Sequence, residues 1–139
     1  MRKRYIVAIA LIALVVFLCI TWYARRKRKR TIDPNDFGER WRELQKLCAS
    51  RKNWPTAIVE ADNLLEEALK RSGYKGRTTG ERLVKAQRAL SDNAGAWFGH
   101  KLRNRIVGED VRKLKKQDII SALTGFREAL RDLGALHRD

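Results

Sequence analysis

The chain has 139 residues, enough for one domain with a short appendage. Its net charge of +15 would by itself suggest a nucleic-acid-binding protein. However, nine of the 31 basic residues flank one uncharged segment, and residues 31–139 carry only +6. More than half of the net positive charge is therefore explained if the uncharged segment spans a membrane and the basic residues flank it. With two histidines, two separate cysteines and no Gly-rich phosphate loop, the sequence offers no metal site and no cofactor site.

The uncharged segment is long enough to cross a bilayer. Residues 5–24, YIVAIALIALVVFLCITWYA, contain no charge, proline or glycine. At about 1.5 Å per residue they span roughly 30 Å, the thickness of the hydrocarbon core. Trp22 and Tyr23 lie at one end, where amphipathic rings prefer the membrane interface. We predict a transmembrane anchor over residues 1–24.

A cleaved signal peptide is the alternative for this segment. Residues 21–24 (TWYA) lack the small-x-small pattern of a cleavage site, and the basic run that follows them opposes export. Cys19 follows Phe17 and Leu18, not the small residue expected before a lipoprotein cysteine. These features favour an uncleaved anchor.

Basic residues on the two sides of the anchor predict its orientation. Three precede the apolar stretch, and six follow it: Arg25, Arg26, Lys27, Arg28, Lys29 and Arg30. By the positive-inside rule, we expect a single-pass protein of the inner (plasma) membrane with its C-terminal domain in the cytoplasm. Residues 25–33 then form a juxtamembrane linker that can bind anionic lipid headgroups. The unpaired cysteines agree with a reducing compartment.

Residues 34–139 are predicted to form an all-α domain, an up-and-down bundle of about five helices with short connections and no strand. Five segments carry apolar residues at helical spacing. Their apolar faces are Phe37, Trp41, Leu44 and Cys48; Ile58, Ala61, Leu65, Ala68 and Leu69; Leu83, Ala86 and Leu90; Trp97, Phe98, Leu102 and Ile106; and Ile119, Leu123, Phe126, Leu130 and Leu133. On its face, Cys48 is expected to be a packed core thiol.

Capping residues predict where these helices begin and end. The expected starts are Asp33-Pro34, Asn53, the capping box from Thr78 to Glu81, and Ser91-Asp92-Asn93. The expected stops are Gly73, Gly108 and Gly134.

Asp62 is unusual because its spacing places it on the apolar face of the second helix. A buried carboxylate needs a partner, which Arg103 or Lys101 on the fourth helix could supply. The alternative is that Asp62 lies at the rim and reaches water. Other acids of the same helix are expected on its solvated face: Glu60, Glu66 and Glu67.

The stretch HKLRNRIVGED, residues 100–110, contains a short motif. Arg103 is followed by four residues and then Gly108. This spacing resembles the Arg-x4-6-His motif of the HEPN superfamily, small helical bundles that include many RNA-cleaving toxins and defence proteins. A polar residue commonly follows the Arg in that motif, as Asn104 does here. The resemblance extends loosely over residues 34–136, and the chain is also similar to small membrane-anchored helical proteins of bacteria.

Gly108 stands where the family has its histidine, the base that would take a 2′-hydroxyl proton. The resemblance therefore implies a domain that no longer catalyses and serves as a tethered binding or scaffolding module. Such a module would pair into homodimers, as HEPN relatives often do, or bind RNA or protein. Arg103 can still hold a phosphate and Asn104 a base.

Two other interpretations remain open. In one, the protein is a membrane-tethered endoribonuclease in which His100, three residues before Arg103, replaces the missing base. In the other, the motif serves the fold: Arg103 pairs with Asp62, Asn104 satisfies a loop carbonyl, and Gly108 adopts a positive φ.

Two further basic segments could line an RNA surface: Lys75 and Arg77 in a loop, and residues 112–116 (RKLKK). No aromatic residues interleave RKLKK for base stacking. Solvated faces, or contact with anionic lipid, are the simpler expectation for both.

Overall fold

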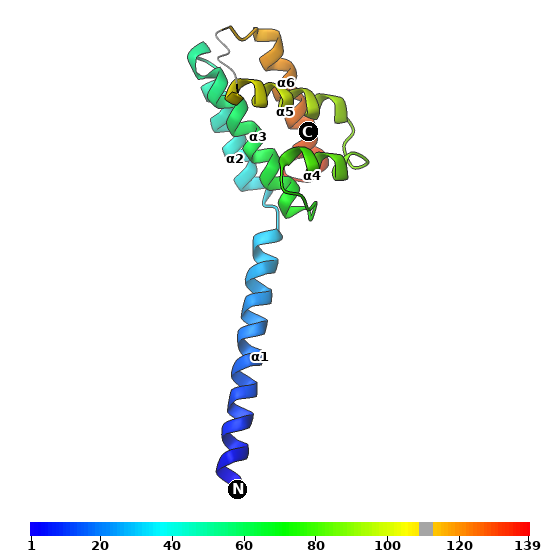
Figure 1. Cartoon of the computed structure of the whole chain (residues 1–139). Helices are drawn as coiled ribbons and strands as arrows, with labels where there is room; N and C mark the ends of the chain where they lie inside the picture. Colours follow the sequence, from blue (N-terminus) through cyan, green and yellow to red (C-terminus); the bar gives the residue numbers. More distant parts are fainter. Residues whose placement is uncertain (109–112) are drawn as a thin grey trace. The chain divides into compact units, whose positions relative to one another are not determined.

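The structure is a computed structural model that describes residues 1–108 and 113–139, with side chains described outside residues 26–30. Within these ranges the chain forms six α-helices, one short 3-10 helix and no strand (Figure 1). The all-helical prediction is therefore confirmed. The elements are α1 (Arg2–Arg30), α2 (Pro34–Leu47), η1 (Arg51–Asn53), α3 (Trp54–Arg71), α4 (Thr79–Ala86), α5 (Asn93–Gly108) and α6 (Lys116–Asp132).

The helices form two compact units, residues 1–31 and residues 32–139. The first unit consists of α1, whose large apolar side chains from Tyr5 to Tyr23 are 50–67 % exposed. Such a continuous exposed apolar surface is unfavourable in water and is typical of a helix surrounded by lipid. Residues Arg2–Arg25 are long and apolar enough to span a membrane, in agreement with the predicted anchor.

In the second unit, α3 is the central helix, because it packs against α2, α4, α5 and α6. The predicted apolar face of α3 is buried completely, from Ile58 to Leu69. Phe37 of α2, Leu83 of α4 and Phe126 of α6 complete the core around it, each with no exposed surface. Burial of this apolar area supplies most of the favourable free energy of folding.

Helices α5 and α6 form the most extensive pair, and glycines bring their backbones together. A Cβ atom at Gly125 would lie 2.1 Å from the carbonyl oxygen of Gly95. A Cβ atom at Gly99 would lie 2.7 Å from Cζ of the Phe126 ring. A side chain at either position would collide with the partner helix, so both sites require glycine at this separation.

These small residues change the expected buried face of α5. Phe98 was predicted to face the core, but it is 42 % exposed. Large apolar residues dominated the spacing pattern, whereas the close approach of α6 leaves room mainly for small side chains. The buried residues of α5 are Ala96, Gly99, His100 and Leu102.

The predicted helix starts are largely correct. The Asp33 carboxylate accepts a hydrogen bond from the backbone N–H two residues later, at 3.0 Å. Thr78 Oγ1 accepts one from the Glu81 N–H at 3.2 Å, but the reciprocal half of the capping box is not formed. Instead, Glu81 Oε2 accepts from the Arg77 N–H at 2.6 Å. Asn53 precedes α3 without a capping side-chain hydrogen bond.

The helix ends divide the predicted glycines into two kinds. Gly73 and Gly134 have φ angles of +90° and +76°, and they end α3 and α6 in the left-handed conformation that glycine favours. Gly108 is the last residue of α5, but it is not one of the described residues with positive φ. The expectation that Gly108 serves a left-handed turn is therefore wrong.

Candidate functional site between α3 and α5

Asp62 lies inside the domain and is only 2 % exposed, so it does not lie at the rim. Its Oδ1 atom is 2.8 Å from Nδ1 of His100. Its Oδ2 atom is 3.5 Å from Nε of Arg103. Lys101, the other partner considered for this carboxylate, is exposed on α5 and takes no part in the pairing.

The helical repeat explains why these residues meet. His100, Arg103 and Asn104 are three and four residues apart, which places them on neighbouring faces of α5. Asn104 Nδ2 is 3.3 Å from Nε2 of His100, and Arg103 Nη1 donates to Asn104 Oδ1 at 3.1 Å. We call Asp62, His100, Arg103 and Asn104 the Asp62 cluster.

Hydrogen-bond chemistry assigns the tautomer of His100. A carboxylate only accepts, so Nδ1 of His100 carries the proton that Asp62 binds. Nε2 of the neutral imidazole then accepts from the amide of Asn104. Both ring nitrogens and the Asp62 carboxylate therefore have partners within the domain.

The contact with Arg103 is the weaker of the two that Asp62 makes. At 3.5 Å, the separation between Nε and Oδ2 fits an ion pair but is long for a hydrogen bond. Consistent with this, Arg103 Nε is buried without a hydrogen-bond acceptor among the described residues. The side chain of Arg103 is 30 % exposed, so the cluster reaches solvent at its Arg103 and Asn104 end.

Two neighbours cover the imidazole. The Trp97 ring meets it edge-on, with centroids 5.9 Å apart. From α4, a Cβ atom at Gly80 would lie 3.6 Å from Nε2 of His100. The His100 side chain is 9 % exposed as a result.

Gly108 lies outside this cluster. The residue is exposed, and a Cβ atom there would meet no atom within 4 Å. The loop residues Lys75 and Arg77 are also exposed, as is Arg25 in α1. Glu109, Asp110 and Arg112 lie outside the described residues, and so do the side chains of Arg26, Lys27, Arg28, Lys29 and Arg30.

Within RKLKK, the three described lysines are exposed, but Leu114 is buried. The carbonyl oxygen of Leu114 accepts a hydrogen bond from Arg51 Nη2 at 3.2 Å. This segment is therefore tied to the domain at one residue and is not a uniformly solvated basic run.

Sequence reasoning missed the ion pairs of α3. Glu67 was expected on a solvated face, yet it pairs with Arg40 of α2 at 2.7 Å and also with Arg71. Glu66 pairs with Arg82 of α4 at 3.1 Å. The hydrogen bond from Arg40 holds the pKa of Glu67 below its usual value, and the same bond raises the pKa of Arg40. These ion pairs join α3 to α2 and to α4. Glu60, in contrast, is exposed as expected.

Cys48 is half-buried rather than part of the closed core. Its Sγ atom is 3.4 Å from the carbonyl oxygen of Leu44. Burial raises the pKa of the Cys48 thiol, so the thiolate needed for nucleophilic attack is disfavoured.

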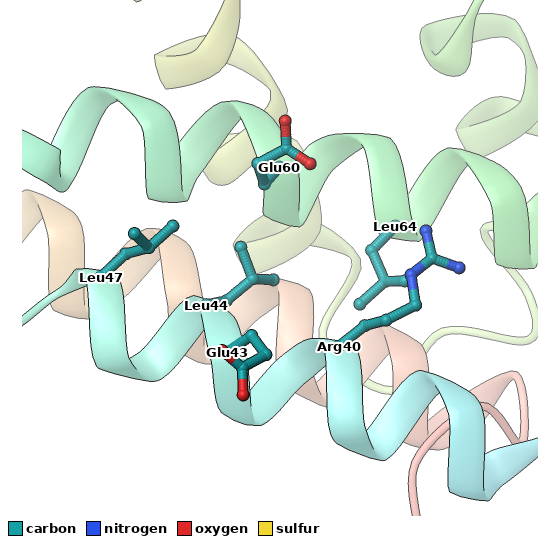
Figure 2. A pocket seen from close by; sticks show the side chains of 6 residues that line it. All are labelled: Arg40, Glu43, Leu44, Leu47, Glu60 and Leu64. Atoms are coloured by element: carbon teal, nitrogen blue, oxygen red, sulfur yellow. The ribbon is translucent and has the colours of Figure 1, made fainter.

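A pocket of about 250 Å³ lies between α2 and α3 (Figure 2), and none of its lining residues belongs to the Asp62 cluster. Leu44, Leu47 and Leu64 form its apolar surface. Arg40 reaches across from α2, while Glu43 and Glu60 lie at its edges (Figure 2). The volume is below that of most small-molecule sites, which span roughly 300–1,000 Å³.

Among the described residues, no group of three or more His, Cys, Asp or Glu side chains could hold a metal ion. The Asp62 cluster consists of a carboxylate, an imidazole, an amide and a guanidinium. No protein-family model, curated protein or solved structure matches the chain.

Proposed function

We propose that the chain is a single-pass inner-membrane protein whose cytoplasmic domain is a HEPN-like, up-and-down bundle that binds or scaffolds and does not catalyse. The exposed apolar surface of α1 supports the membrane tether. The basic residues that follow the apolar stretch, from Arg25 to Arg30, support a cytoplasmic domain and contact with anionic headgroups.

The main support for a domain that does not catalyse is that both ring nitrogens of His100 already have hydrogen-bond partners. Asp62 binds Nδ1, Asn104 contacts Nε2, and the ring is almost fully covered. A general base needs a free nitrogen within reach of the substrate proton. Nothing at Gly108 replaces it, because glycine carries no titratable side chain.

Under this proposal, the Asp62 cluster joins α3 to α5 and keeps the domain rigid, while the partner contacts its outer surface. The expected partners are a second copy of the chain, another protein or RNA. Multi-angle light scattering of the purified full chain, in micelles of known mass, measures directly whether two copies of the chain associate.

An RNA titration tests the absence of catalysis. The full chain, in nanodiscs of zwitterionic lipid, is titrated with labelled single-stranded RNA near physiological salt, and the RNA is then run on a denaturing gel. We expect the RNA to stay intact. Cleavage that disappears in His100→Ala would overturn the proposal.

A matched pair of variants separates specific binding from simple charge. Arg103→Gln removes the cluster's cation, whereas Lys101→Gln removes an exposed cation from the same helix. RNA binding that is weakened only by Arg103→Gln indicates a site at the cluster. Equal weakening by both indicates general electrostatic attraction.

One observation favours an alternative, an RNA-binding protein or metal-independent endoribonuclease. The carboxylate of Asp62 orients His100 through Nδ1, which leaves Nε2 as the basic nitrogen, the arrangement used by catalytic histidines. Arg103 lies beside it with an exposed edge. Gly108→His tests this alternative, because RNA cleavage gained by the variant would show that the motif lacks only its base.

A further inference from the structure

A second, open pocket of about 370 Å³ lies between α2 and α6, and the chain that follows α6 forms part of its wall. We call it the α2–α6 pocket. Its walls include Trp41 and Arg42 from α2, Arg127 and Arg131 from α6, and Asp139. None of these residues belongs to the Asp62 cluster, so the pocket does not depend on the role proposed for that cluster; only a lipid source for its ligand rests on the proposed membrane tether.

Three buried N–H groups of the residues lining this pocket have no hydrogen-bond acceptor among the described residues: Trp41 Nε1, Arg127 Nε and Arg131 Nε. Trp41 is only 7 % exposed, so water has little access to its indole N–H. Buried donors without acceptors are uncommon in folded proteins, and each one requires an explanation. All three belong to residues that line one pocket, and this grouping points to a ligand that carries several acceptor oxygens.

The charges around the pocket favour an anion. Arg131 is already paired, since its two terminal amino groups donate to Glu128 at 3.1 Å and to Asp139 at 2.9 Å. Arg127 Nε is 3.8 Å from Glu128, which is beyond hydrogen-bonding distance. The wall of the pocket therefore holds three arginines, Arg42 included, against two neighbouring carboxylates, Glu128 and Asp139, and His137 adds an imidazole.

The first turn of α2 adds to this preference. Pro34, Asn35 and Gly38 line the pocket, and the N-terminal end of a 14-residue helix carries a partial positive charge. Asp33 caps one N–H of this turn, so the helix contributes mainly its dipole.

We infer that the α2–α6 pocket binds a phosphate group. A tetrahedral phosphate offers acceptor oxygens in several directions, which suits guanidinium N–H groups and an indole N–H together. The group can come from a phospholipid headgroup or from a free phosphate ester. A headgroup is the natural source for a domain whose pocket begins at Pro34, four residues after the last residue of α1.

The test uses the full chain in micelles of a neutral detergent. Thermal unfolding is measured with inorganic phosphate against sodium chloride of matched ionic strength. A second arm compares short-chain phosphatidylglycerol with short-chain phosphatidylcholine. A probe that binds only the folded state raises Tm, and the rise grows with the logarithm of its concentration once that concentration exceeds Kd.

We expect a phosphate-bearing probe to raise Tm in the unaltered chain and in Arg88→Gln, which removes an exposed charge elsewhere. Arg127→Gln and Arg42→Gln should each weaken binding about tenfold, the typical loss for one charge-assisted hydrogen bond. Arg42 is exposed, so its variant keeps the fold even if Arg127→Gln does not.

The two arms identify the source of the group. A response to inorganic phosphate indicates a free phosphate ester, and a response to phosphatidylglycerol alone indicates a headgroup. The inference is overturned if neither probe acts beyond its control. It is also overturned if Arg42→Gln and Arg127→Gln respond as Arg88→Gln does, because binding would then lie elsewhere, for example at the basic linker.

Discussion

The contact between α5 and α6 makes a sharp prediction for Gly125→Ala. The added Cβ atom would lie 2.1 Å from the carbonyl oxygen of Gly95 and 2.3 Å from its carbonyl carbon. Ordinary contacts of a Cβ atom begin near 3.4 Å. Because both colliding atoms belong to the backbone, no side-chain rotation relieves the overlap, and the two helices must separate by about 1 Å.

The size of the effect follows from two opposing terms. Overpacking a close helix contact costs about 1–3 kcal/mol, and a backbone collision belongs at the upper end. Replacing a mid-helix glycine by alanine returns about 1 kcal/mol through helix propensity. The net loss is about 2 kcal/mol, which lowers Tm by about 8 °C in a domain of this size.

Gly38→Ala is the matched control. Gly38 also lies within a helix, but a Cβ atom there would meet nothing within 4 Å. Only the propensity term remains, so this variant should raise Tm by about 4 °C. Thermal unfolding of the full chain in detergent, followed by circular dichroism at 222 nm, measures both. If Gly125→Ala also raised Tm, the close packing of α5 on α6 would be refuted.

Three further predictions concern the polar contacts. Asp62→Ala and His100→Ala should each lower the unfolding free energy by about 3 kcal/mol. The loss in the double variant should be smaller than the sum of the two single losses by at least about 1 kcal/mol. Additive losses in urea denaturation would argue against the buried hydrogen bond. Glu67→Gln should cost roughly 0.5–1 kcal/mol at neutral pH, because the bond from Arg40 is partly exposed. Since that bond lowers the pKa of Glu67, its contribution is present above the ordinary glutamate pKa and is lost as pH falls through the lowered value. A loss in Glu67→Gln that stayed constant from neutral pH into acid would contradict this. In thermal unfolding, Asp33→Ala should lower the unfolding free energy by about 1 kcal/mol. Asp33→Asn should lower it much less, because asparagine still accepts the capping hydrogen bond. Equal losses in the two variants would show that this hydrogen bond does not stabilise α2.

Local signals in the sequence predicted the elements well. The uncharged run predicted the apolar part of α1. The helix ends were predicted by four residues that act on backbone groups close to themselves in sequence: Asp33, Thr78, Gly73 and Gly134. The buried face of α3 was also predictable, since its large apolar residues recur at helical spacing.

The candidate site was harder to predict because its partners lie far apart in sequence. Asp62 was recognised as a carboxylate on an apolar face, but His100 was not identified as its hydrogen-bond partner. That pairing depends on the rotation of α5, which Gly99 and Gly125 set by bringing α6 close. A spacing pattern weighted by large residues places Phe98 inward instead, and it therefore misses the inward position of His100.

Because α4 covers His100, reagents gain access to the imidazole more easily when α4 opens. This helix has eight residues, too few to be stable alone, and an ion pair at 3.1 Å between Arg82 and Glu66 helps to hold it. Gly80, near its start, lies against Nε2 of His100. Local openings of α4 should therefore speed the reaction of that nitrogen with a reagent such as diethyl pyrocarbonate. The rate of labelling would then report the lifetime of a closed helix, and amide exchange in α4 would follow the same openings.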